Sequence, residues 1–177
     1  MLELSDADGP MRAQADALYL SAFPPGERIP PHILYESCGR PGIRYRCLSD
    51  ADGFAGITYT VETDDILYIV YLAIDGSRRS GGLGGAALRV LMEESGKRTF
   101  LNIEPVSDDA PNPEQRVRRR DFYMRNGFRE HGLLEAPDGN TFMVMVAGGD
   151  FTDAEILDVY DQCGLQDMMS ADARRRS

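Results

Sequence analysis

The sequence predicts a single domain of the α/β (α+β) class, in which helices flank a mixed, mostly antiparallel sheet. Its 177 residues, 42% of them hydrophobic, suit one domain with one sizeable core and argue against disorder. Three β-rich runs follow one another across short polar turns, a pattern typical of antiparallel strands. Helical and strand patterns then alternate to residue 164, and no internal repeat or linker divides the chain.

The N-terminal part predicts one strand and two helices. A short strand is expected at 2–4 and a helix at 9–23, where Met11, Ala15, Leu18 and Ala22 share one face. The stretch "PPGERIPPH" contains four prolines and ends this helix. A second, short helix is expected at 30–38.

The remaining elements follow from runs bounded by turn residues. Strands are expected at 42–48, 53–61, 66–74, 98–106, 128–136 and 140–148, and "PDGN" is a good hairpin turn between the last two. Helices are expected at 83–95, closed by Gly96, at 113–126, closed by Gly127, and at 151–164. Thr152 and Glu155 have the spacing of a capping box at the start of the last helix.

Composition narrows the class of protein. The formal net charge is −10 and Lys97 is the only lysine, so general binding to nucleic acid is not expected. Cys38, Cys47 and Cys163 lie far apart with no paired spacing, which argues against disulfides and a zinc site. The N-terminus has no apolar signal core and no run reaches membrane-spanning length. These observations predict a soluble, cytoplasmic protein without a metal.

A glycine-rich turn between the strand at 66–74 and the helix at 83–95 predicts a bound phosphate. Free N–H groups and the helix dipole at such a helix start attract anions. Gly82-x-Gly84-x-x-Ala87, with Glu104 further along, matches a dinucleotide-binding fingerprint. Against that ligand, the seven residues "DGSRRSG" separate Ile74 from Gly82, and no further βαβ repeats follow.

The other candidate ligand is coenzyme A. The stretch "LAIDGSRRSGGLGGAAL" resembles the acetyl-CoA-binding motif of the Gcn5-related N-acetyltransferases, with Leu72, Ile74, Arg79, Gly82 and Gly84 in the expected places. "FYMRNGF" is similar to a second signature of that family, in which Tyr123 is followed four and five residues later by glycine and phenylalanine.

The resemblance covers residues 1–147, because the order of expected elements also matches the family's. Residues 148–177 then form a C-terminal helix and tail on the same domain. The family often has asparagine seven residues and alanine four residues before the tyrosine, where this chain has Arg116 and Arg119. Arginines on this helix, among many acids, more often form an ion-paired or solvated face than a binding patch.

The resemblance implies a sheet that splays open between the strands at 66–74 and 98–106, with the pantetheine arm of acetyl-CoA in the gap. A backbone bulge near Leu72 would offer an N–H to the oxyanion, and Tyr123 would protonate the leaving thiolate. Glu104 is the candidate base, and Glu27 is a candidate substrate-binding acid. The implied cofactor-binding residues are Leu72, Ala73, Ile74, Arg79, Ser80, Gly81, Gly82, Leu83, Gly84 and Gly85.

The expected activity is therefore transfer of an acetyl group from acetyl-CoA to a primary amine by direct attack. A small-molecule amine is the expected acceptor, with no nucleic-acid or membrane partner. Two alternatives stay open: an acyl-CoA sensor on the same fold that needs neither Tyr123 nor a base, and the dinucleotide-binding protein. The last helix packs either on the domain or on a second copy in a homodimer.

Overall fold

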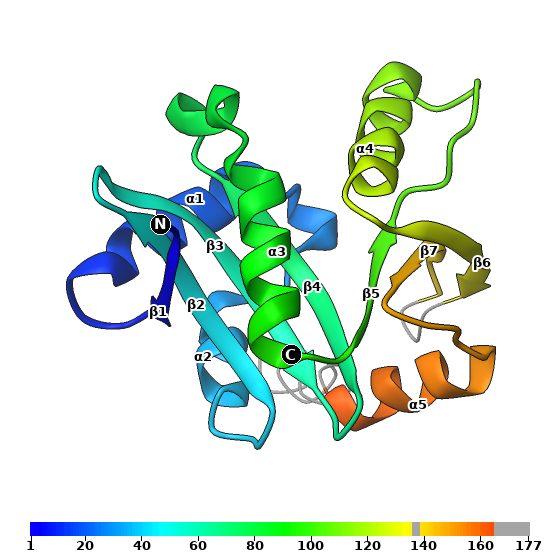
Figure 1. Cartoon of the computed structure of the whole chain (residues 1–177), viewed down its shortest axis with the longest axis horizontal. Helices are drawn as coiled ribbons and strands as arrows, with labels where there is room; N and C mark the ends of the chain where they lie inside the picture. The colour runs from blue at the N-terminus through cyan, green and yellow to red at the C-terminus, as the bar shows by residue number, and fades with distance from the viewer. Residues whose placement is uncertain (136–138, 165–177) are drawn as a thin grey trace, which may run out of the picture.

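The computed structural model describes residues 1–135 and 139–164, apart from the side chains of Arg79 and Ser80. A seven-stranded sheet runs through the molecule in the order β1-β2-β3-β4-β5-β7-β6 (Figure 1). Only β4 and β5 pair in parallel; every other pair of neighbours is antiparallel. Among the residues described, no helix has the length and apolar character needed to cross a membrane.

The predicted elements are present, with small changes at their ends. The strands are β1 (Glu3–Asp6), β2 (Ile43–Asp50), β3 (Gly53–Glu62), β4 (Ile66–Ile74), β5 (Arg98–Ile103), β6 (Arg129–Glu135) and β7 (Thr141–Ala147). The helices are α1 (Arg12–Ala22), α2 (Pro31–Ser37), α3 (Leu83–Ser95), α4 (Pro113–Arg125) and α5 (Asp153–Cys163). Three 3-10 turns are η1 (Gly9–Met11), η2 (Pro25–Glu27) and η3 (Gly76–Gly81).

Two strand predictions need comment. The strand expected at 98–106 ends at Ile103, so Glu104 lies just beyond β5, where the chain turns away from the sheet. Residues 137 and 138 of the "PDGN" turn between β6 and β7 lie outside the described residues. The capping box is present as predicted, since Thr152 Oγ1 accepts from Glu155 N at 3.3 Å and the Glu155 carboxylate accepts from Thr152 N at 2.8 Å.

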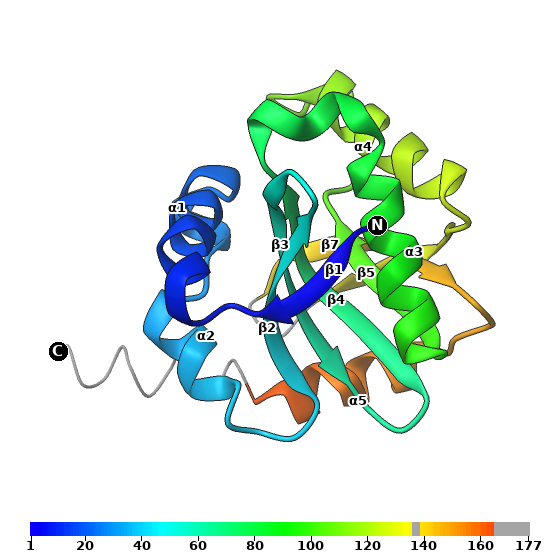
Figure 2. The same ribbon diagram turned by 60° about the vertical axis from the view of Figure 1, so that its left-hand side comes forward.

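Helices cover both faces of the sheet. Helices α1 and α2 lie on one face and α3 and α4 on the other (Figure 2). Strand β4 shows why both layers form: Ile66 and Tyr68 belong to the core under α1, α2 and α5, whereas Leu67 and Ile69 belong to the core under α3. Side chains alternate across a strand, so an apolar run such as "ILYIVYLAI" buries both of its faces.

A β-bulge interrupts this alternation in the middle of β4. Tyr59 and Thr60 are consecutive in β3, but they pair with Tyr71 and Ile69, so Val70 is an extra residue in β4. The extra residue reverses the faces, and Tyr71 therefore packs on the same side of the sheet as Tyr68. The bulge was predicted near Leu72 and lies two residues earlier.

The sheet opens on the other edge of β4. The parallel pairing with β5 covers only Ile66–Ile69, which face Arg98–Leu101. Beyond that point the two strands diverge, as the ribbon shows (Figure 1). The predicted splay is thus confirmed, and the edge of β4 is open toward β5 at Leu72 and Ala73.

Helix α5 closes the end of the sheet opposite the splay. Ile156, Val159, Tyr160 and Cys163 are buried in the core beneath α1 and α2. Arg98 of β5 reinforces this contact by pairing with Glu155 at 2.8 Å. The sheet contains one parallel pair and no series of βαβ units, so the fold does not support the dinucleotide-binding alternative.

Candidate active site

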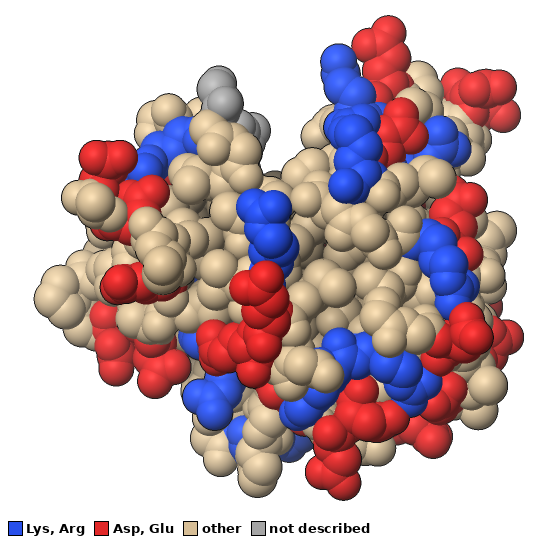
Figure 3. Space-filling view, in the orientation of Figure 1, with Lys and Arg blue, Asp and Glu red and all other residues tan. Residues whose placement is uncertain are grey.

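The divergence of β4 and β5 creates a cleft of about 710 Å³. Its walls come from the segment between α1 and α2, from both diverging strands, from α4, and from β7. In the space-filling view it opens as a notch between the η3 turn and α4, with arginine side chains on the α4 side (Figure 3). The cleft therefore brings together elements that are far apart in the sequence.

The glycine-rich turn connects Ile74, which lines this cleft, to the start of α3. Gly82 has φ +70° and ψ +10°, a left-handed conformation that favours glycine. No side chain caps the helix, and Ala86 N is the first amide to find a backbone partner, Gly82 O at 3.1 Å. Among the described residues, the N–H groups of Leu83, Gly84 and Gly85 have no acceptor, which suits an anion.

The two neighbouring arginines of η3 have different surroundings. Arg78 turns away from the helix start toward Asp50 of the β2–β3 hairpin. Its Nη2 donates to both carboxylate oxygens of Asp50, Oδ1 at 2.9 Å and Oδ2 at 2.8 Å. This contact holds the pKa of Asp50 below its usual value. The backbone of Arg79 and Ser80 belongs to η3, and their side chains lie outside what the structure describes. The role predicted for Arg79 and Ser80 stays a prediction.

Gly84 and Gly85 allow α4 to lie close to α3. A Cβ atom on Gly84 would be 3.0 Å from Cζ of Phe122, and one on Gly85 would be 2.6 Å from Oδ1 of Asn126. Both contacts point at α4. A side chain at either position would therefore crowd the packing between the two helices.

Tyr123, one residue after Phe122, lines the cleft from α4. Its ring packs edge-on against Phe122 and Phe128, with centroids 5.1 and 5.7 Å apart. Burial raises the pKa of its phenol, and the nearby Arg119 opposes that shift. No described residue accepts a hydrogen bond from its hydroxyl, so a protonated donor faces the cleft.

Glu104 is the centre of an ion-paired cluster rather than an isolated acid. Its Oε1 lies 2.9 Å from Arg116 Nη2, and its Oε2 lies 2.8 Å from Arg119 Nη1. Arg116 is itself fixed by Asn112 Oδ1 at 3.0 Å and by Pro105 O at 2.9 Å. The prediction of an ion-paired arginine face on this helix is confirmed for both arginines.

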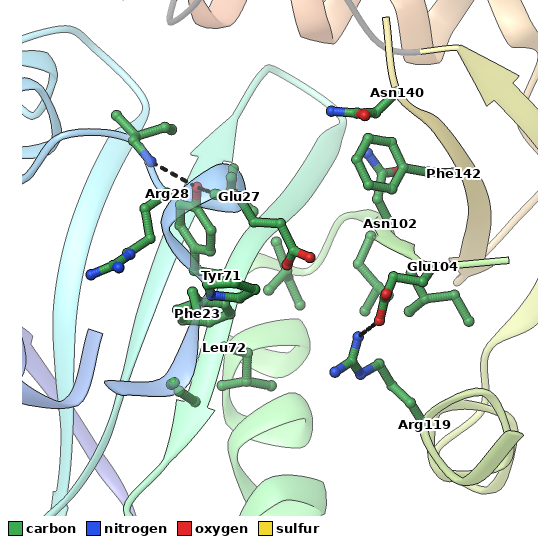
Figure 4. Close-up of a pocket in the computed structure, with 18 of the residues that line it drawn as sticks. Phe23, Glu27, Arg28, Tyr71, Leu72, Asn102, Glu104, Arg119, Asn140 and Phe142 are labelled. Atoms are coloured by element: carbon green, nitrogen blue, oxygen red, sulfur yellow. Dashed lines mark hydrogen bonds and ion pairs between the residues drawn. The ribbon is translucent and has the colours of Figure 1, made fainter. Parts of the chain in front are cut away.

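Glu27 projects into the cleft from the opposite wall (Figure 4). The pKa of its carboxyl is raised, first by burial and then by the negative charge of Glu104. Tyr71 holds the backbone of this segment, because its hydroxyl donates to the carbonyl of Glu27 itself at 2.7 Å and accepts from Ile29 N at 3.2 Å. The predicted acids Glu27 and Glu104 thus face one another across the cleft.

Several lining residues were not predicted. Tyr160 donates to Asn102 Oδ1 at 2.8 Å, and Asn102 donates to the Tyr68 hydroxyl at 3.2 Å, which fixes the end of the cleft near α5. Asn140 and Phe142 of the β7 segment complete that wall (Figure 4). Asn102, Asn140 and Phe142 lie in runs expected to be strands, and Tyr160 lies in the expected last helix. Nothing in those runs marks these side chains as part of a site.

Cys163 also lines the cleft, at the end of α5. Burial raises the pKa of its thiol to about 12, so the reactive thiolate is scarce at neutral pH. A protonated, buried thiol is a poor nucleophile, and the expected direct attack does not require one. Within residues 1–135 and 139–164, no cluster of His, Cys, Asp and Glu side chains could hold a metal ion.

Comparison with known proteins bears on the fold. No protein-family model matches the chain. A stretch of 78 residues is 32% identical to YjbC of Bacillus subtilis (strain 168), whose name places it among the acetyltransferases. That match covers 44% of this chain and spans only 38% of the relative's length.

Solved structures match over nearly the whole chain. An acetyltransferase of the GNAT family from Bacteroides thetaiotaomicron superposes with a TM-score of 0.72 at 23% identity, over 93% of this chain and 96% of that one. This chain has the GNAT fold. An aminoglycoside 6′-N-acetyltransferase complexed with coenzyme A has a TM-score of 0.64 at 15% identity, over 86% of this chain and 99% of that one.

The GNAT fold confirms the architecture predicted from the two motifs. Both motif segments line the same region in the structure: the first forms β4 and the start of α3, and the second forms the end of α4. The roles of their individual residues are not decided by a likeness of fold, since function depends on the site itself.

The contact between Gly84 and Phe122 gives a prediction about stability. Gly84→Val should lower the free energy of unfolding by about 1–3 kcal/mol, because the new side chain overpacks the α3–α4 contact. In a double variant that also carries Phe122→Ala, part of the loss caused by the valine should disappear, because the space that it needs is vacated. Urea denaturation of both single variants and of the double variant measures this effect. If the double variant loses as much as the two single variants added together, the packing explanation is wrong.

Proposed function

We propose that this protein transfers an acetyl group from acetyl-CoA to the primary amine of a small molecule. One observation carries the proposal: β4–β5 pairing stops at Ile69 and opens a cleft lined by Tyr123 and by β4 as far as Ile74, from which η3 leads to the uncapped start of α3. A thioester of CoA has both groups that this arrangement can accommodate: an anionic pyrophosphate for the start of α3 and an acyl group that would lie near Tyr123. The solved neighbour in complex with coenzyme A supports that choice.

The pyrophosphate of CoA would lie at the start of α3. The N–H groups of Leu83, Gly84 and Gly85 supply donors there, and Arg79 supplies charge. The pantetheine arm would run along the open edge of β4 and use Leu72 and Ala73, with Ile74, as a substitute strand. Ser80 and Gly81 would complete the turn around the phosphates.

The chemistry is a direct transfer between two bound substrates. The amine lone pair attacks the thioester carbonyl carbon and forms the C–N bond, and the carbonyl electrons move to oxygen. The bulge at Val70 leaves backbone there outside the regular ladder, so a main-chain N–H can serve the oxyanion. When the C–S bond breaks, the electron pair goes to sulfur and Tyr123 supplies its proton.

A base must take the proton that the amine loses. The two carboxylates among the described lining residues are Glu104, the base predicted from the sequence, and Glu27. Either one reaches the cleft from a different wall, and the acceptor would enter between them. Cys163 takes no part, because its thiol is protonated and buried.

The cofactor proposal predicts binding of CoA and no binding of NAD in calorimetry. Arg79→Ala should weaken CoA binding by about 1–3 kcal/mol, the cost of a lost charge-assisted phosphate contact. Arg89→Ala is the matched control, since Arg89 is an exposed arginine further along α3. Binding of NAD without CoA, or equal losses in both variants, would overturn the proposed phosphate site.

The transfer reaction predicts release of free thiol when acetyl-CoA is incubated with a panel of primary amines. Tyr123→Phe keeps the ring that packs on Phe122 and removes only the hydroxyl. CoA affinity should therefore hardly change, and kcat should fall by about 10²–10⁴, as for a positioned acid. A kcat within a few-fold of wild type would place the acid elsewhere. Acetyl-CoA binding without turnover of any amine would indicate a sensor.

A further inference from the structure

The two carboxylates of the cleft differ in what surrounds them, and this bears on the base of the proposed reaction. Both oxygens of Glu104 are held by guanidinium groups, and its side chain is 22% exposed. The Glu27 carboxylate forms no ion pair with any described residue and projects into the cleft, whose walls shield it only in part. A base must release and accept protons freely, and a carboxylate clamped by two arginines is poorly suited to that.

Glu27 is also fixed close to the reacting part of β4. Tyr71 follows the bulged residue Val70 directly, and its hydroxyl bonds to the Glu27 carbonyl and to the Ile29 amide. The ring of Tyr71 is wedged between Phe23 and Tyr19, with centroids 4.7 and 5.1 Å away. These contacts hold the Glu27 segment beside the bulge, on the wall opposite Tyr123 and Glu104.

An acceptor entering between these walls would meet Glu27 on one side and the thioester on the other. Figure 4 shows the Glu27 side chain turned toward the cavity and the Arg28 side chain turned away from it. Arg28 is directed instead at Leu20 O, 3.3 Å away. Within the described part of the chain no cation pairs with Glu27, so its negative charge is available to an incoming ammonium group.

We propose that Glu27 accepts the proton of the acceptor amine, and that Glu104 is a positioning residue that holds Arg119 in the cleft. This inference rests on the proposed acetyl transfer. One proton passes from the ammonium group to Glu27 and then to solvent, which leaves a neutral amine to attack. After attack the nitrogen loses a second proton, again toward Glu27, and this balances the proton that Tyr123 gives to the thiolate sulfur.

The charges around Glu27 set the direction of its titration. Glu104 beyond β5 raises the pKa of Glu27, whereas Arg119 and Arg116 of α4 lower it, and burial adds to the rise. Tyr71, whose hydroxyl bonds to the backbone of this segment, and Arg28, which turns away, also lie next to Glu27. Since the base works only when ionised, kcat/KM should rise with pH through the Glu27 pKa, at a higher pH than for an ordinary glutamate.

Substitutions of Glu104 and Arg119, the two members of one ion pair, should shift the pKa of Glu27 in opposite directions, which tests the proposed arrangement. Glu104→Gln removes a negative charge and leaves two guanidinium groups unbalanced, so the Glu27 pKa should fall. Arg119→Gln removes a positive charge, so the same pKa should rise. Carboxyl ¹³C NMR of glutamate-labelled protein measures both without any substrate, with the Glu27 signal assigned by its loss in Glu27→Gln.

Arg118→Gln is the matched control for these titrations. Arg118 lies on the same helix with its side chain 75% exposed, and it approaches Glu114 at 3.9 Å. The substitution makes the same change in net charge as Arg119→Gln, but outside the cleft, and should leave the Glu27 pKa unmoved. Shifts of equal sign in Glu104→Gln and Arg119→Gln, or shifts no larger than the control's, would overturn the inference.

Turnover separates this inference from the proposed function. With an amine found in the thiol-release panel, Glu27→Gln should lower kcat by about 10²–10⁴ and keep acetyl-CoA affinity. Glu104→Gln should lower kcat less and move the acid limb of the pH profile to lower pH. If wild type turns over and Glu27→Gln stays within a few-fold of it, the base is not Glu27 and acetyl transfer stands. If wild type releases no thiol, both fail.

Discussion

Strand β4 pairs with β3 as far as its last residue, Ile74, but with β5 only over Ile66–Ile69. The cleft forms because the second pairing is the shorter one. A parallel pair that continued would have filled the gap with backbone hydrogen bonds. The bulge at Val70 falls just where the second partner is lost. The bulge turns Tyr71 to the face of the sheet on which the α1–α2 segment lies. It therefore lies where the cleft opens, and it also anchors the wall of the cleft that this segment forms.

The overall charge is a poor guide to the electrostatics of this cleft. The chain carries a formal charge of −10, yet the wall formed by α4 brings two arginines onto one glutamate. Much of the negative charge lies elsewhere, for example on Asp50, which is occupied by Arg78. Local pairing decides which groups stay available to a ligand, and pairing depends on the fold.

The sequence was informative wherever local signals decide structure. The bounds of β4 and α3 match the predicted ones, because an apolar run, a glycine turn and the closing Gly96 mark them without help from distant residues. The capping box of α5 is likewise a local motif. The remaining features of the fold, including the splay, were predicted from the resemblance of the two motifs to a known family.

The sequence could not show which side chains meet across the cleft. Arg78 and Arg79 are equivalent as letters, and only the position of the β2–β3 hairpin assigns Arg78 to Asp50. Arg116 and Arg119 departed from the family pattern, but nothing local linked them to Glu104, more than ten residues earlier. Such pairings depend on how α4 sits against the end of β5, which is a property of tertiary packing.

The attachment of the α1–α2 segment to β4 has a consequence for how this protein can change over evolution. The Tyr71 hydroxyl bonds to a carbonyl and an amide of the main chain, which every residue except proline supplies at those places. Side chains in the segment can therefore be exchanged without moving the segment itself. A new acceptor could be accommodated by substitutions here while the strand, the turn and the helix that suit the cofactor remain unaltered.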